Sequence, residues 1–171
     1  ADDEKFIREG IAGSIKKEFG DNVNVFTARN GKLAFEMICS SENQIDIVLT
    51  DIIMPELSGL ELIQNVREKG IPCEFIILSS YDDFSYAQKA IRTGVCEYIL
   101  KPCENKMIFD TIRKVSEKIE NQKKEKNFSK QTINSMLGSW FDGKINFSEV
   151  KNYIAFDSNA NSKSNSTAQT A

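Results

Sequence analysis

Five polar residues of this chain carry the side chains that phosphoryl chemistry requires. Two or three carboxylates held close together favour a hard divalent cation, and Mg2+ suits such an oxygen-rich site. A carboxylate in that place can also attack phosphorus and form an acyl phosphate. A lysine adds a compact positive charge, and a serine adds a small hydroxyl donor for the phosphoryl oxygens. The five residues are Asp2, Asp3, Asp51, Ser79 and Lys101.

Asp51 is the central residue of this set. It follows the strand-like apolar run 45–49, and turn signatures (Met-Pro, then Ser-Gly) come soon after it, within residues 54–59. A buried strand that ends in a carboxylate places charge where open α/β sheets hold their ligands. An aspartate there also often caps the next helix or turn, and taken alone Asp51 is more typical of a cap. Asp2 and Asp3 alone are likewise typical of acids that begin a helix.

The chain has no histidine among its 171 residues. It therefore cannot build a Ser-His-Asp or Cys-His site, a histidine-based zinc centre, or a phosphohistidine of its own. Chemistry in this chain must depend on carboxylates, lysine, serine or threonine, and an oxygen-preferring metal.

The overall composition predicts a globular domain with an appendage. Hydrophobic residues make up 40% of the chain and charged residues 27%, which is ordinary for such proteins. No apolar run approaches the roughly 20 residues that span a bilayer, so we expect no membrane segment. The net charge of −3 argues against broad electrostatic binding of nucleic acid. The cysteines lie far apart in or beside apolar stretches, which favours reduced thiols and a cytosolic location.

Helical and strand-like periodicities alternate along the chain. Such an alternation predicts an α/β fold with a parallel sheet covered on both faces. The carboxyl ends of parallel strands meet in one crevice, which would bring Asp51, Ser79 and Lys101 together. We expect helices over residues 6–19, 33–38, 60–69, 84–92 and 107–119, and strands over residues 23–27, 45–49, 75–78 and 98–100.

The alternation begins with a helix instead of a strand. The acids Asp2 and Asp3 stand directly before the first helical pattern, with no strand ahead of them. The pattern leaves room for an absent first strand. We expect residues upstream of Ala1 to supply that strand, or the segment 145–147 or 152–156 to pair in its place.

The pattern changes after residue 120. Residues 121–156 predict a helical linker extension, charged at first and then with the weak periodicity of a small helical pair. Residues 157–171 are nearly all Ser, Asn, Thr, Ala, Lys and Gln, a composition that cannot bury a core, so we expect disorder there.

Residues 2 to about 120 resemble the receiver domain of two-component response regulators. The resemblance implies a receiver domain over residues 1–120. Its fold would be a flavodoxin-like doubly wound parallel sheet of order 2-1-3-4-5, here without the first strand. The matching motifs are Asp2-Asp3-Glu4, Thr50-Asp51-Ile52-Ile53-Met54-Pro55 with Ser58-Gly59, Leu78-Ser79-Ser80-Tyr81, and Tyr98-Ile99-Leu100-Lys101-Pro102.

The resemblance also implies roles for the acids. Asp51 would be the phosphoacceptor. Mg2+ would be held by Asp3, Asp51 and the backbone carbonyl of Ile53, with Asp2 helping through water.

The remaining motif residues would contact or report the phosphoryl group. Ser79 and Lys101 would contact it, and Tyr98 would change rotamer as Ser79 moves. The peptide bond between Lys101 and Pro102 could be cis and so direct the lysine, although trans has the higher base rate.

The implied function is a regulatory switch. A partner histidine kinase would supply the phosphoryl group, and the domain would catalyse at most its own phosphorylation from small donors and its own dephosphorylation. A homodimer would form through the helix expected at 84–92, the strand at 98–100 and the helix at 107–119, or through the helical extension. Residues 3–11 and 80–87 resemble the subgroup with AraC-type DNA-binding output. DNA binding and transcription regulation are therefore expected only through an output domain that this chain does not display.

Two other functions remain open from the residues. A phosphatase of the haloacid-dehalogenase type also uses an aspartate at a strand end. Such enzymes usually place a general acid two residues later, where this chain has Ile53. The third hypothesis is an interaction domain that keeps the fold but does not switch, and the absent first strand favours it.

Overall fold

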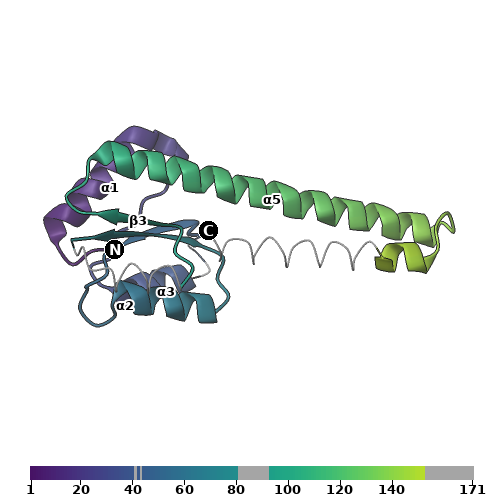
Figure 1. Cartoon of the computed structure of the whole chain (residues 1–171), viewed down its shortest axis with the longest axis horizontal. Coiled ribbons are helices and arrows are strands. Elements are labelled where there is room, and N and C mark those ends of the chain that lie inside the picture. The colour runs from purple at the N-terminus through teal and green to yellow at the C-terminus, as the bar shows by residue number, and fades with distance from the viewer. Residues whose placement is uncertain (41, 43, 81–92, 153–171) are drawn as a thin grey trace. The chain divides into compact units, whose positions relative to one another are not determined.

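The computed structural model describes residues 1–40, 42, 44–80 and 93–152 (Figure 1). The chain divides into two compact units, Ala1–Lys118 and Ile119–Ala171. The first unit contains the sheet and all of the residues proposed for the site.

The first unit is built on a parallel sheet of three strands among the described residues, in the order β1-β2-β3. The strands are β1 (Ile47–Thr50), β2 (Glu74–Ser79) and β3 (Glu97–Leu100). The central strand β2 is buried along nearly its whole length, because it has a neighbour on each edge and helices over both faces. Isoleucine and phenylalanine suit such a strand, since branched and aromatic side chains pack well on a pleated surface.

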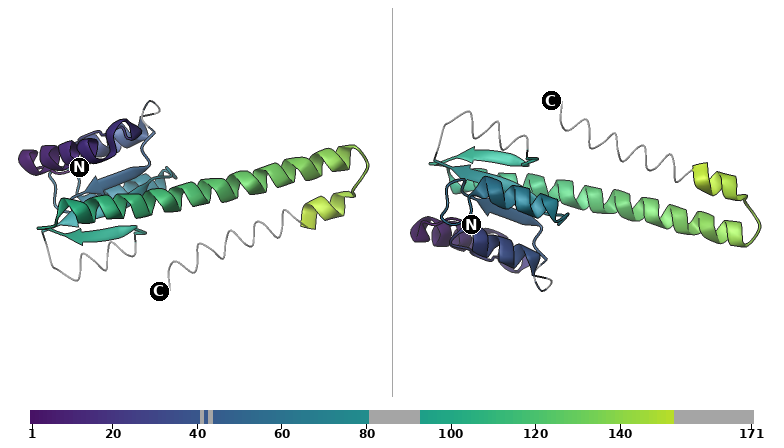
Figure 2. Two further views of the ribbon diagram at one scale, coloured as in Figure 1. Left: turned by 90° about the horizontal axis from the view of Figure 1, so that it is seen from above. Right: turned by 90° about the horizontal axis from the view of Figure 1, so that it is seen from below.

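Helices cover both faces of the sheet, as the sequence predicts for a doubly wound fold (Figures 1 and 2). Helices α2 (Gly31–Cys39) and α3 (Gly59–Glu68) lie on one face. Helix α1 (Lys5–Phe19), followed by a short 3-10 turn, and the first part of α5 (Asn105–Phe141) lie on the other. The main core fills the space under α2 and α3, where Ala34, Ile38, Leu62, Ile63 and Val66 meet Val48, Phe75 and Ile77.

The flavodoxin-like fold is confirmed, but one predicted strand is wrong. Residues 23–28 are not paired as a strand, although Val23 has extended backbone angles (φ −136°, ψ 139°). To be a strand, this segment needs a second strand to pair with, and only Ala1 and Asp2 lie in that position. Ala1 accepts a hydrogen bond from the Asp51 amide (3.0 Å), and the Asp2 amide donates one to the Ala28 carbonyl (3.1 Å). A two-residue bridge cannot provide a ladder along residues 23–27, so their β propensity finds no partner.

The segment 145–147, considered for the gap, does not pair there. Residue 147 begins a helical stretch that runs to 152, and Val150 within it is 1% exposed. The rings of Trp140 and Phe147 lie 5.3 Å apart in this second unit, whose helical content agrees with the predicted extension. The predicted helix at 84–92, residues 153–156 and the predicted disordered tail at 157–171 lie outside the described residues.

Two expectations from the composition concern membrane-spanning helices and the state of the cysteines. Among the described residues, no helix combines the length and the apolar character that crossing a bilayer requires. Cys39, Cys73, Cys96 and Cys103 are all free thiols. Burial raises the pKa of Cys73 to about 11, so this thiol stays protonated at neutral pH and behaves as a small apolar side chain.

Candidate functional site

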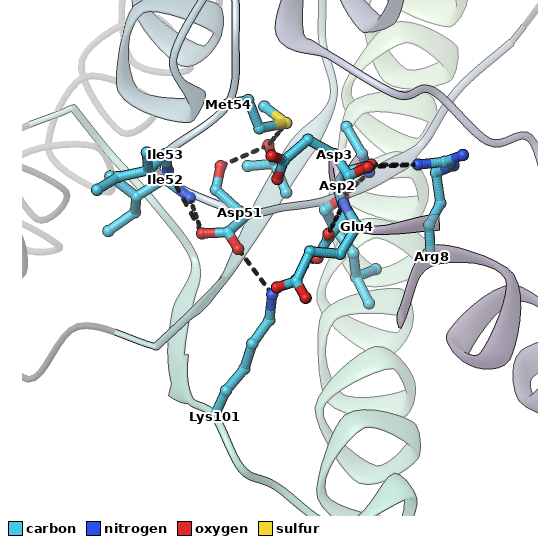
Figure 3. A network of polar contacts seen from close by, with 12 residues as sticks. Asp2, Asp3, Glu4, Arg8, Asp51, Ile52, Ile53, Met54 and Lys101 are labelled. Atoms are coloured by element: carbon cyan, nitrogen blue, oxygen red, sulfur yellow. Dashed lines mark hydrogen bonds and ion pairs between the residues drawn. The ribbon is translucent and has the colours of Figure 1, made fainter. Parts of the chain in front are cut away.

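The strand ends bring three of the predicted residues to one edge of the sheet. Asp51 directly follows β1 and is 8% exposed. Ser79 is the last residue of β2 and is fully buried. Lys101 directly follows β3, and its amide donates a hydrogen bond of 2.7 Å to the Ser79 carbonyl. The parallel register therefore sets Lys101 beside Ser79, and its long side chain reaches toward Asp51 (Figure 3).

The lysine ammonium lies between two carboxylates. Its Nζ donates a hydrogen bond of 2.7 Å to Oδ2 of Asp2 and another of 2.7 Å to Oδ2 of Asp51. The two acid oxygens are thus no further apart than twice that distance. All three side chains are nearly buried, with exposed fractions of 10% for Lys101, 7% for Asp2 and 10% for Asp51. In such a place two carboxylates repel strongly unless a cation compensates them.

The environment keeps Lys101 charged. Burial by itself lowers the pKa of a lysine, because it disfavours the charged form. The hydrogen bonds to Asp2 and Asp51, together with the negative charges of these acids, outweigh that effect and raise the pKa above 10.5. The site therefore holds a permanent positive charge between its two buried acids.

Asp51 serves two roles with its two oxygens. Its Oδ1 accepts hydrogen bonds from the amides of Ile52 (2.6 Å) and Ile53 (3.4 Å), which is the turn-capping role considered from the sequence. Its Oδ2 faces Lys101. The capping and site interpretations are therefore compatible, because each uses a different oxygen.

Asp2 divides its oxygens in the same way. Its Oδ1 accepts a hydrogen bond of 2.9 Å from the amide of Glu4, the N-cap residue of α1, and its Oδ2 accepts from Lys101. Asp3 has an exposed side chain, and its carbonyl accepts a hydrogen bond from Arg8. The structure thus joins Asp2, and not the carboxylate of Asp3, to the ion-paired cluster.

The arrangement suits a hard cation in its donor chemistry. The cation that the sequence resemblance implies at this site is Mg2+. Asp2 and Asp51 supply carboxylate oxygens that converge on one point. Of the other predicted ligands, Asp3 has an exposed side chain, and Ile53, which would bind through its carbonyl, is 45% exposed. That point is held by the Lys101 ammonium, and among the described residues no group of three or more acids or cysteines has the geometry of a metal site.

The loop after Asp51 is closed tightly against its own start. The Gly59 amide donates a hydrogen bond of 2.8 Å to the Ile52 carbonyl. A Cβ atom at Gly59 would lie 2.0 Å from the Asp51 carbonyl oxygen, so only glycine fits. Ser58 and Glu61 then form a capping box at the start of α3, which lowers the pKa of Glu61 through its hydrogen bonds from Ser58.

A contact that the sequence analysis missed ties this loop to α2. Asn30 is buried, caps α2 by accepting a hydrogen bond of 2.8 Å from the Leu33 amide, and donates its side-chain amide to Glu56. Glu56 adopts a left-handed backbone (φ 66°) that is rare for a non-glycine residue. The Asn-Gly pair at 30–31 was the available signal, but it indicates a turn and does not reveal a partner 26 residues away.

Two further predictions concern Tyr98 and the peptide bond between Lys101 and Pro102. Tyr98 is partly buried and packs against the core cluster. The peptide bond between Lys101 and Pro102 is cis.

A parallel α/β sheet with acids and a lysine at its carboxyl edge defines a flavodoxin-like domain. Residues 1–113 match the sequence profile described as the response regulator receiver domain. The chain therefore belongs to the family of response regulator receiver domains. Domains of this family are regulatory phosphoacceptors and not conventional enzymes.

The relatives agree with this assignment. The chain is 38% identical over 122 residues (71% of the chain, 33% of the relative) to YesN of Bacillus subtilis, described as an uncharacterized transcriptional regulatory protein. It is 40% identical over 106 residues (61% of the chain, 40% of the relative) to the transcriptional regulatory protein HptR of Staphylococcus aureus. The chain thus spans only a third to two fifths of the length of these curated relatives.

Solved structures show the same fold. The chain resembles the REC domain of AraT, a response regulator from Geobacillus stearothermophilus, with a TM-score of 0.62 and 40% identity. The match covers 71% of this chain and 93% of that one. A response regulator receiver domain protein from Clostridium thermocellum gives a TM-score of 0.64 at 26% identity, covering 71% of this chain and 94% of that one.

The close approach at Gly59 predicts the effect of one methyl group. Gly59→Ala should lower the free energy of unfolding by about 2–3 kcal/mol, because the Asp51 backbone must move to admit the Cβ. The matched control is Gly10→Ala in α1, where a Cβ would meet nothing within 4 Å and where the change should stabilise by about 0.5–1 kcal/mol. Urea unfolding measures both, and equal effects would contradict the close approach.

The buried charge cluster predicts a pH-dependent role for Lys101. Lys101→Met should destabilise the fold by roughly 3 kcal/mol at neutral pH, because it leaves two nearly buried carboxylates without their cation. Folding raises the pKa of Lys101 above 10.5. The stabilisation by its charge is therefore complete below pH 10.5 and is lost as the pH rises through the pKa of the folded protein.

Urea titrations of the wild type and Lys101→Met, from neutral pH to above pH 10.5, measure the difference in the free energy of unfolding. Lys106→Met removes an exposed lysine and serves as the control. A difference that grows above pH 10.5 would contradict the assigned direction of the shift.

Proposed function

We propose that this chain is a phosphorylation-dependent signalling switch in which Asp51 accepts a phosphoryl group from a partner histidine kinase. The observation that supports it most is the Lys101 ammonium, 2.7 Å from both Asp2 and Asp51 at the carboxyl edge of the sheet. This cluster combines a nearly buried nucleophilic carboxylate with a fixed positive charge, and both are needed to receive an anionic group.

In the proposed transfer, a carboxylate oxygen of Asp51 forms a bond to phosphorus as the P–N bond of the partner's phosphohistidine breaks. The freed imidazole takes up a proton. The two amides at Oδ1 hold the carboxylate in one orientation, and Lys101 exchanges its contact with Asp51 for one with a phosphoryl oxygen. Asp3, Asp51 and the carbonyl of Ile53, with Asp2 helping through water, would hold Mg2+, which would neutralise charge on the phosphoryl oxygens.

The proposed output follows from two residues of the neighbouring strands. Ser79 would contact the phosphoryl group from the end of β2, and Tyr98 would change rotamer as Ser79 moves. The positions of both residues support this role, since Ser79 is beside Lys101 and Tyr98 lies one strand away in register with Ile77. Any catalysis by the chain itself would be its own phosphorylation from small donors and its own dephosphorylation.

The switch would act through parts of a longer protein. YesN and HptR are described as transcriptional regulatory proteins. We therefore propose transcription regulation in the cytosol through a DNA-binding output domain, of the AraC type on the sequence resemblance. In this proposal residues 1–120 are the receiver domain and residues 121–156 are the linker that leads away from it.

Phosphorylation should promote a homodimer through β3, α5 and the helix predicted at 84–92, or through the helical extension. Leu100 and Met107 are apolar residues of β3 and α5, and they are 43% and 54% exposed. Sedimentation should give a monomer before phosphorylation and a dimer after it, and Met107→Glu should keep the phosphorylated chain monomeric. Phe6→Glu, at a residue of α1 that is 90% exposed, is the control that should still dimerise. Dimerisation of phosphorylated Met107→Glu would move the interface to the helical extension.

The phosphoacceptor assignment has a direct test. Incubation with Mg2+ and a small acyl phosphate should add one phosphoryl group to the wild type, measured by intact mass, and none to Asp51→Asn. Asp46→Asn removes an acid just before the same strand and should be phosphorylated like the wild type. An unmodified wild type would favour the non-switching interaction domain, and turnover of a generic phosphate ester would favour the phosphatase.

A further inference from the structure

Arg8 lies in α1 with its guanidinium turned back toward the acidic pair (Figure 3). Its Nη1 donates one hydrogen bond of 2.7 Å to the carbonyl oxygen of Asp2 and another of 3.3 Å to the carbonyl oxygen of Asp3. We propose that Arg8 is a positioning residue for Mg2+ binding, which holds the short segment that carries both acids. This inference rests on the proposed function.

The segment needs such a holder because the helix does not supply one. The N-cap residue of α1 is Glu4, and its side chain makes no capping hydrogen bond. The hydrogen bond that opens the helix runs from the Arg8 amide to the Glu4 carbonyl at 3.0 Å. Asp2 and Asp3 come before Glu4 in the chain, and their carbonyl oxygens accept hydrogen bonds from the Arg8 side chain instead.

The two acids depend on Arg8 to different degrees. Asp2 is also held through its amide by Ala28 and through its carboxylate by Glu4 and Lys101. Asp3 has an exposed carboxylate and is held through its carbonyl by Arg8. Loss of the guanidinium should therefore release Asp3 first, which is the acid that the proposed magnesium site needs as a direct ligand.

Charge and geometry make opposite predictions at this position. As a positive charge beside the acids, Arg8 opposes the approach of a cation, so its removal would tighten Mg2+ binding. As a holder of the acid segment, it preorganises a ligand, so its removal would weaken binding. Partners that orient metal ligands typically change metal affinity by about 10-fold to 100-fold.

Three variants separate these effects. Arg8→Met removes the charge and both hydrogen bonds while keeping an unbranched apolar stem. Arg8→Lys keeps the charge and a nitrogen with three donors, and a single nitrogen makes both contacts in the native chain. Lys5→Met removes a positive charge from the same helix, where the side chain is 69% exposed and paired with Glu9 at 3.9 Å, without touching the acid segment.

Calorimetric titration of the full chain with Mg2+ is the main measurement. Arg8→Met should weaken Mg2+ binding about 10-fold, equivalent to about 1.4 kcal/mol. Arg8→Lys should restore most of the affinity, and Lys5→Met should leave it unchanged or slightly tighter. Amide NMR spectra without Mg2+ provide a second readout, in which the Asp3 and Glu4 signals should shift in Arg8→Met, and the Asp3 signal should keep its position in Lys5→Met.

The outcomes also separate this inference from the function on which it rests. Equal or tighter Mg2+ binding by Arg8→Met, beside a wild type that binds, would overturn the positioning role and leave the proposed switch intact. Unshifted Asp3 and Glu4 signals in Arg8→Met would overturn it too. A wild type that binds no Mg2+ would overturn the magnesium part of the proposed function, and this inference with it.

Discussion

The site depends on one buried ammonium. Asp2 and Asp51 come from segments far apart in sequence, and their carboxylates could not lie close together at low exposure without a cation. Lys101 supplies it because β3 ends level with β2, with Ser79 opposite Leu100 in the parallel register. A shift of one residue in that register would turn the lysine to the other face of the sheet. The pairing of β2 with β3 is thus a condition for the ion-paired cluster at the end of β1.

The surrounding backbone restricts Asp51 to one orientation. One carboxylate oxygen is held by amides of its own turn, so only the other oxygen is left for the lysine. Gly59 closes the loop against the Asp51 carbonyl, and the contact from Asn30 holds Glu56 in its left-handed conformation. These contacts cost conformational freedom and some strain, which is a common way to preorganise a functional loop. The loop is therefore attached to α2 and α3, the helices that cover the main core.

Much of the fold could be predicted because it follows from local patterns. The apolar periods predicted β1, β2, β3, α1, α2, α3 and the start of α5 to within a few residues, since each pattern is written in consecutive side chains. The end of α5 was not predicted, because the helix continues without a break from the expected residues 107–119 to Phe141. The strand at 23–27 was wrong because a strand exists only through a partner, and residues 1–2 bridge that gap at one end only. The bond from Asn30 to Glu56 and the role of Arg8 were missed for a related reason. Each contact depends on the backbone path of a second segment, which the side-chain pattern of the first segment does not reveal.

The sequence by itself determined which reactive side chains this protein has. Without histidine, and with acids, a serine and a lysine next to apolar runs, it admitted phosphoryl chemistry on a carboxylate and excluded most alternatives. Taken alone, Asp51 was more typical of a cap, and the other motif residues and the resemblance made it the expected phosphoacceptor. Only the tertiary structure gave its two oxygens different partners and brought Lys101 to Asp51 across 50 residues and to Asp2 across 99. Residue types are local, but the direction of a side chain and the partner it meets are set by strand register and packing.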